Sequence, residues 1–192
     1  MFDYFGVLIS IVFGLALTHL LRGVGRMIEL RRETRPYWVQ LVWAFNCVVF
    51  VLAIWWGMYW WKGLAEWTAE WFFFIVGYAV AIFMWAYVLF PAEVSPGVDF
   101  EDYFYANRRW FFGIGMLVFL MDIPETVRKS LLHLRPMPVV YPYVITGFLL
   151  MCGIGWMTDN RRVHNVLCVA CMLLLLGYIF FSSLERIAAH FT

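Results

Sequence analysis

Charged side chains are scarce in this sequence. Lys, Arg, Asp and Glu make up 14% of the 192 residues, whereas 64% are hydrophobic and 21% are aromatic. A soluble domain carries about a quarter charged residues and about half apolar ones, so a chain of this composition could not cover its own surface in water. The composition predicts an all-α integral membrane protein that forms a single domain over residues 1–192. The net charge of +1 indicates no bulk attraction to nucleic acid.

Cysteine is sparse as well. The four cysteines are Cys47, Cys152, Cys168 and Cys171, and each lies inside an apolar run. This placement argues against a disulfide framework on an extracytoplasmic face. Cys168 and Cys171 form a CxxC pattern without a second pair of ligands, so they are interpreted as small packing residues in preference to a metal or redox site.

Recognisable catalytic motifs are absent. The sequence contains no nucleophile–base signature, no HExxH, no phosphate-binding loop and no dinucleotide fingerprint. The Gly-x-Gly pairs at 23–25, 113–115 and 153–155 lack the strand context that such motifs need. We therefore expect a protein that is not an enzyme and that carries no cofactor.

Long apolar runs are what the sequence does contain. A membrane-spanning helix needs about 20 mostly apolar residues. Six segments meet this requirement, which predicts a six-transmembrane-helix bundle with spans at about 3–22, 37–61, 70–90, 109–128, 139–157 and 163–186.

The basic residues are divided unequally between the two sides of this predicted bundle. One side carries Arg22, Arg26, Arg31, Arg32, Arg35, Arg108, Arg109, Arg161 and Arg162, and the other carries Lys62, Arg128, Lys129, Arg135 and Arg186. Because cytoplasmic loops are enriched in Lys and Arg, the first side is expected to be cytoplasmic and both termini extracytoplasmic. The tryptophan-rich segments at 55–61 and 66–71 then fit an aromatic belt at the outer membrane surface.

The connection between the third and fourth spans has a pattern of its own. Phe100, Tyr103 and Phe104 recur at helical spacing, Asp99 could cap a helix start, and a break at 95–97 precedes them. This pattern predicts a short amphipathic helix, at about 99–107, that lies in the inner membrane interface. A docking surface for a partner would show the same pattern.

Polar residues inside the spans are informative because they are costly in a bilayer. The rise of a helix per residue gives the depth of each polar residue in its span. By this estimate, four of them lie at a similar depth in the outer half of the membrane. This proposes an outer polar layer that consists of Asp122, Ser10, Thr146 and Ser182.

Asp122 itself allows two interpretations. In the first, Pro124 and the charges after it end the fourth span, and Glu125 pairs with Lys129 among the outer headgroups. In the second, Asp122 points inward to a polar cavity. We favour an inward orientation, because a charged side chain that faces lipid at this depth costs about 2.5–3.5 kcal/mol.

A second polar layer is predicted near the cytoplasmic side. It includes Thr18, His19, Asn46 and His164. His19 and His164 fall at comparable depth on different spans, as two axial haem ligands must. Hydrogen bonds that hold helices together, with Asn46 and His19 inside the bundle, are the favoured interpretation.

Small residues recur every four positions along the first span, at Gly6, Ser10, Gly14 and Thr18. Such a stripe lets a second helix approach closely. It predicts helix packing, and both packing within the bundle and packing between subunits stay open.

Four stretches resemble a family of small, uncharacterised bacterial membrane proteins. They are "FDYFGVLISIVFGLALTHLLRGVGRMI" near the start, "RPYWVQLVWA" after it, "LFP" at 89–91 and "YFYANRRWFFG" at 103–113. The resemblance covers roughly residues 1–115 and implies a bacterial inner membrane. No activity is established for that family, so it implies no functional residue.

Together these patterns favour a small channel or transporter for an ion or solute, with Asp122 in its pathway. The alternative is a structural or accessory subunit of a membrane complex, which would use the stripe at Gly6 and Gly14 to bind another copy or another membrane protein. A haem-binding membrane protein is a third, minor alternative. Membrane lipids are expected neighbours in all three cases.

Overall fold

The apolar runs form helices throughout the computed structural model, which describes residues 2–94 and 97–190, with side chains described for 4–94 and 97–184. The elements in this part of the chain are α1 (Phe2–Glu29), α2 (Trp38–Met58), the short 3-10 helix η1 (Tyr59–Gly63), α3 (Ala69–Val88), α4 (Phe100–Leu131), α5 (Tyr141–Met157) and α6 (Arg161–His190).

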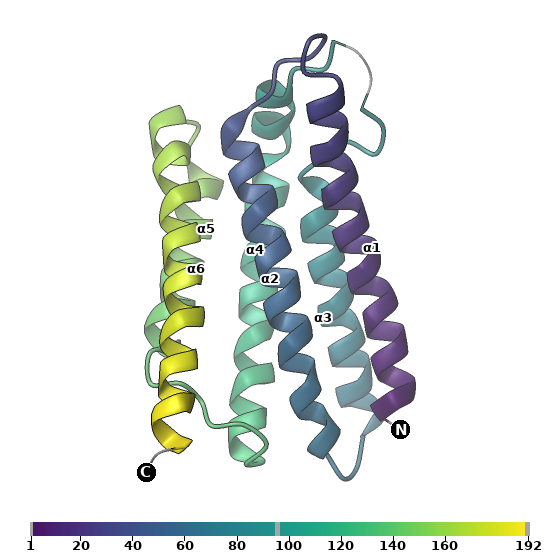
Figure 1. Cartoon of the computed structure of the whole chain (residues 1–192), viewed down its shortest axis with the longest axis vertical. Helices are drawn as coiled ribbons and strands as arrows, with labels where there is room; N and C mark the ends of the chain where they lie inside the picture. The colour runs from purple at the N-terminus through teal and green to yellow at the C-terminus, as the bar shows by residue number, and fades with distance from the viewer. Residues whose placement is uncertain (1, 95–96, 191–192) are drawn as a thin grey trace.

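The helices run up and down in one bundle (Figure 1). α1 packs against α2 and α3, α4 packs against α3 and α5, and α6 packs against α2 and α5. This order leaves α1 and α6 on opposite flanks of the bundle, and the start of α1 lies at the same end as the end of α6 (Figure 1). The all-helical class is therefore confirmed, and the two ends of the chain share one end of the bundle.

Five helices in the described part of the chain are long and apolar enough to cross a membrane, which is typical of a multi-pass membrane protein. α5 is the exception, because its 17 residues fall short of the about 20 that a span needs. The predicted fifth span at 139–157 begins too early, since α5 starts only at Tyr141 and carries Pro142 in its first turn. The count of six spans is thus not established by helix length.

The predicted interfacial helix at 99–107 is wrong. These residues are the cap and the first turns of α4, which continues without a break to Leu131. Asp99 does cap the helix, because its Oδ1 accepts hydrogen bonds from the backbone N–H groups of Glu101 (2.9 Å) and Asp102 (3.2 Å). Phe100 and Phe104 are almost fully buried, so this segment faces the protein core instead of a membrane surface.

Aromatic rings fill the centre of the bundle, where α2, α3 and α4 meet. Phe50 contacts Trp85, Phe119 and Phe148 with ring centroids 5.0–5.4 Å apart. Gly115 makes the contact between α3 and α4 possible, because a Cβ atom there would lie 2.8 Å from Nε1 of Trp85. The four cysteines are buried and free, as expected for packing residues.

Candidate functional site

Three charged side chains of α4 share one face of the helix. Asp122, Glu125 and Lys129 are spaced by three and four residues, which brings them onto one side. Glu125 and Lys129 are 3% exposed, and α4 runs through Pro124 to Leu131. The charged face therefore points into the protein, whereas Leu117, Leu120 and Leu131 are exposed.

Glu125 and Lys129 form an ion pair inside the bundle. Oε1 of Glu125 also accepts a hydrogen bond from the indole N–H of Trp61 at 2.9 Å. Nζ of Lys129 donates to the backbone carbonyl of Gly57 at 2.7 Å and lies 5.4 Å from the ring centre of Trp61. Both charges are thus compensated by each other and by groups of α2 and η1.

The predicted pairing of Glu125 with Lys129 is confirmed, but its predicted location among the headgroups is wrong. A buried ion pair persists only where further hydrogen bonds offset the loss of water. Trp61 and Gly57 supply those hydrogen bonds. Trp61 is fully buried, so this member of the predicted aromatic belt points inward, while its neighbours Trp55 and Trp56 are exposed.

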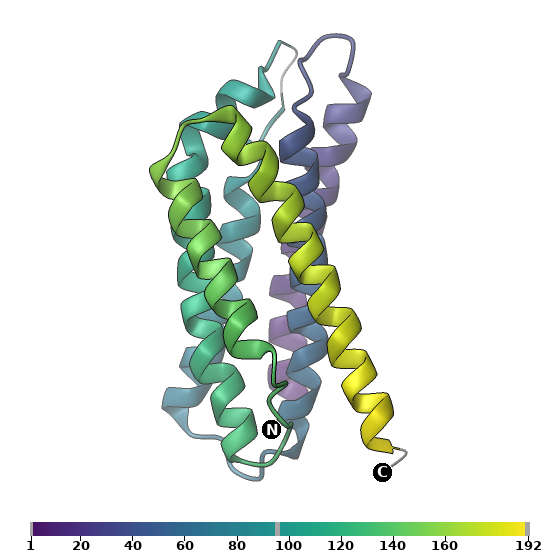
Figure 2. The same cartoon turned by 90° about the vertical axis from the view of Figure 1, so that its left-hand side faces the viewer.

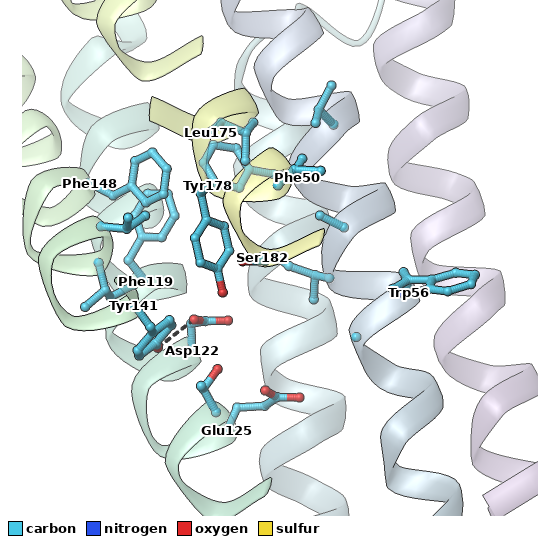
Figure 3. A pocket seen from close by; sticks show the side chains of 18 of the residues that line it. Phe50, Trp56, Phe119, Asp122, Glu125, Tyr141, Phe148, Leu175, Tyr178 and Ser182 are labelled. Atoms are coloured by element: carbon cyan, nitrogen blue, oxygen red, sulfur yellow. Dashed lines mark hydrogen bonds between the residues drawn. The ribbon is translucent and has the colours of Figure 1, made fainter. Parts of the chain in front are cut away.

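Asp122 has a different environment one turn earlier on α4. Its Oδ1 accepts a hydrogen bond from the phenol of Tyr78 and its Oδ2 accepts one from the phenol of Tyr141, each at 2.8 Å. Figure 3 shows that the side chain of Tyr178 on α6 also points toward the carboxylate. No ion pair to Asp122 occurs within the residues whose side chains are described. The carboxylate therefore points inward and is half-buried, and Lys129 and Arg135 line the same cavity without forming an ion pair to it.

This carboxylate lines a cavity of about 520 Å³. α6 diverges from α5 toward the end of the bundle that holds the chain ends (Figure 2), and the cavity lies in this widening against α2 and α4. Its polar part is lined by Tyr78, Asp122, Glu125, Thr126, Lys129, Arg135, Tyr141, Tyr178, Ser182 and Ser183. Its apolar part includes Phe50, Phe119, Val144, Ile145, Phe148 and Leu175.

Only Ser182 joins Asp122 from the predicted outer polar layer. It lines the same cavity. Ser10 and Thr146 are exposed: Ser10 accepts a hydrogen bond from Trp55 at 3.2 Å, and Thr146 donates to the backbone carbonyl of Pro142 at 2.7 Å. Neither residue lines the cavity. Their similar depth followed from counting residues, but the side of the helix on which each lies depends on helix packing.

The residues of the predicted inner layer are not gathered in one place. Asn46 is buried and its side-chain amide donates to the backbone carbonyl of Cys168 at 3.0 Å. This bond joins α2 to α6, as expected for a polar residue that holds two helices together. Thr18 is exposed and its hydroxyl donates to the carbonyl of Gly14 on its own helix at 2.7 Å.

The two histidines do not fit axial ligation of one haem. His19 on α1 stacks on Tyr87 with ring centroids 4.7 Å apart. His164 on α6 is enclosed by Phe104, Tyr105 and Phe112, and its Nε2 lies 2.9 Å from the carbonyl oxygen of Thr158. Among the described side chains the two rings share no ring neighbour, and their helices lie on opposite flanks of the bundle (Figure 1). Within the described residues, no group of three or more His, Cys, Asp or Glu could hold a metal ion.

The small-residue stripe of α1 faces away from the bundle. No atom would lie within 4 Å of a Cβ atom at Gly6 or Gly14, apart from their own helix and immediate neighbours. Ser10 and Thr18 are exposed on the same side. Within the described residues, Gly6 and Gly14 therefore have open space beside them, whereas Ser10 between them accepts the hydrogen bond from Trp55 of α2.

Comparison with known proteins found no matching family model, no matching curated protein and no matching solved structure. The chemistry of the site itself is thus the basis for assigning a function.

Three residues of the site were not anticipated from the sequence. Tyr78 and Tyr141 are ordinary aromatic residues of apolar runs, and Trp61 belonged to the predicted belt. Tyr141 gave the clearest signal, because it begins a helix directly after the loop 132–140, on the side of the membrane expected for Asp122. Tyr78 lies in the middle of α3, and nothing in its neighbourhood distinguishes it.

Proposed function

We propose that this protein is a small membrane channel or transporter that passes an ion or a small solute through the cavity beside Asp122. The observation that supports this function is a carboxylate that forms no ion pair among the described side chains and lies at the wall of a cavity inside the bundle. A charge held only for structure would be paired, as Glu125 is with Lys129. An unpaired carboxylate in a membrane protein is instead typical of a pathway or binding site.

In this proposal α5 crosses the membrane within the bundle although it is short, packed against α4 and α6. The chain then has six spans, with both termini extracytoplasmic and the nine arginines of the other end facing the cytoplasm. The resemblance of the first 115 residues favours a bacterial inner membrane. The proposed role is not enzymatic.

Flux through proteoliposomes tests the function. Purified protein is reconstituted and uptake of radiolabelled rubidium and methylammonium is compared with that of empty liposomes. We expect uptake of at least one of the two probes. This uptake should fall about tenfold or more in Asp122→Asn and stay unchanged in the matched variant Thr146→Val, whose side chain is exposed on α5. Uptake no greater than in empty liposomes for both probes contradicts a cation pathway. Uptake by Asp122→Asn that equals the uptake by the wild-type protein would show that Asp122 is not part of the pathway.

An accessory subunit of a membrane complex is the second candidate, and the outward stripe at Gly6 and Gly14 favours it. Small residues on an outer helix face allow another helix to pack closely. Replacing both glycines with leucine would then disrupt an assembly with a second copy or another membrane protein without affecting the fold. Size-exclusion chromatography of the detergent-solubilised variant distinguishes this role, because transport by a single chain predicts no change in assembly.

A further inference from the structure

We infer that the cavity beside Asp122 binds a monovalent organic cation with an apolar body, such as an alkyl or aryl ammonium. This inference rests on the proposed function, because it names the class of solute that the same site would take. Four features of the cavity support it: the uncompensated charge, the phenols around that charge, the apolar compartment next to it and the position of the mouth.

The first feature is the electrostatic balance of the lining. Glu125 and Lys129 neutralise each other and are held by Trp61 and Gly57. Arg135 lies over the ring of Trp60 at 6.0 Å, in the loop beyond the end of α4. Asp122 accepts hydrogen bonds from Tyr78 and Tyr141 but forms no ion pair among the described side chains, although Lys129 and Arg135 line the same cavity. A cation in the cavity would offset the cost of keeping this charge away from water.

The second feature is the way in which Asp122 is held. Its two oxygens already accept hydrogen bonds from Tyr78 and Tyr141. These phenols stabilise the charge without cancelling it, and they use part of the acceptor capacity of the carboxylate. A hard metal cation requires six or more oxygen ligands, which this arrangement does not offer. An ammonium group requires only a counter-charge and aromatic faces, to which it is attracted within about 6 Å of the ring centre.

The third feature is the apolar compartment on the other side of the carboxylate from Glu125. Figure 3 shows Phe119, Phe148 and Leu175 grouped on this side, away from Glu125. Phe119 and Phe148 stack with their ring centres 4.9 Å apart. The volume of about 520 Å³ lies within the range of about 300–1,000 Å³ that is typical of small-molecule sites. A bare inorganic ion would leave most of this space empty, whereas an apolar body would fill it.

The fourth feature is the mouth of the cavity. Leu52 and Trp56 of α2 and Ser183 of α6 line the cavity and are exposed on the surface. The cavity therefore reaches the surface of the bundle along α2 and α6, two helices long enough to cross a membrane. An amphipathic cation concentrates at a membrane surface and could enter by this route, so the position of the mouth matches the ligand class.

Binding of benzyltrimethylammonium to the purified full-length protein in nanodiscs tests the inference, with titration calorimetry as the readout. Neopentylbenzene, the uncharged molecule of the same shape, is the matched ligand control. We expect the cation to bind about tenfold or more tightly than the neutral molecule, a difference of about 1.4 kcal/mol. We also expect a similar loss of cation affinity in Asp122→Asn but not in Thr146→Val. Equal affinity for both molecules, or no binding of the cation to the wild-type protein, overturns the inference.

The comparison of the two ligands uses the wild-type protein, so it stands even if a variant fails to fold. The flux experiment and the binding experiment can also give opposite results, and each combination has a distinct meaning. Rubidium uptake that depends on Asp122, without binding of benzyltrimethylammonium, contradicts the ligand class and leaves the transport function intact. Binding that depends on Asp122, without flux of any cation, supports the ligand class and contradicts transport.

Discussion

Asp122 and Glu125 lie one turn apart on the same face of α4, but only Glu125 forms an ion pair. Glu125 is buried against Lys129 and Trp61, so its charge is compensated by an ion pair and an indole N–H. Asp122 is half-buried at a cavity wall and receives hydrogen bonds only from phenols. A compensated charge stabilises the contact between helices. A charge that is hydrogen-bonded but not neutralised remains available to a ligand.

Removing the cation of the compensated pair should have the largest effect. In Lys129→Met the carboxylate of Glu125 is left buried without its partner, which typically costs about 3–5 kcal/mol. We expect this loss in the free energy of unfolding, measured by denaturant titration of the purified protein in detergent. The double variant Glu125→Gln/Lys129→Met carries no buried charge at this place and should recover most of the stability. A double variant as unstable as the single one would show that the pair is not the cause.

The indole N–H of Trp61 should contribute the next largest effect. Trp61→Phe keeps an aromatic ring but removes the hydrogen bond to Glu125, and a hydrogen bond to a charged group contributes about 1.5–3 kcal/mol. Trp55→Phe is the matched control, because Trp55 is exposed and bonds only the exposed hydroxyl of Ser10. Thermal denaturation of both variants in the same detergent measures the difference. Equal stability of the two variants would mean that the hydrogen bond from Trp61 to Glu125 adds nothing to stability.

Asp122→Asn should affect stability far less than the loss of Lys129 does. The amide keeps one acceptor oxygen for a phenol and loses the other, while the cost of an unpaired charge disappears. These changes oppose each other, so we expect a shift of no more than about 1 kcal/mol in the free energy of unfolding. Denaturant titration beside Lys129→Met checks this. A loss as large as that of Lys129→Met would place Asp122 in the same structural class as Glu125 and would contradict the comparison.

Thr146→Val should have the smallest effect. The hydroxyl is exposed and bonds only to the carbonyl of Pro142 on its own helix. A surface change of this kind is usually within about 0.5 kcal/mol. The same titration serves as the check, and a larger loss would show that Thr146 takes part in the site after all.

Several local features could be predicted from the sequence. The apolar runs correspond to the helices, with most boundaries within a few residues, because the transfer free energy of a residue into an apolar environment depends mainly on its own side chain. The cap at Asp99 and the pair of Glu125 with Lys129 were also correct, since both depend on short spacings along one helix. The sequence likewise indicated an inward-pointing Asp122, on the basis of the cost of a charge that faces lipid.

What the sequence determined by itself is thus the class of protein, the apolar segments and the short-range polar contacts of α4. The tertiary structure decided the side of the bundle on which each polar residue lies. Ser10 and Thr146 were predicted to share a depth with Asp122, but neither lines its cavity. Trp61 points inward to Glu125, and Tyr78 of α3 donates a hydrogen bond to Asp122. The physical reason is that the predicted depth of a residue follows from a fixed rise per residue. Whether its side chain faces the interior or the surface depends on which helices pack around it.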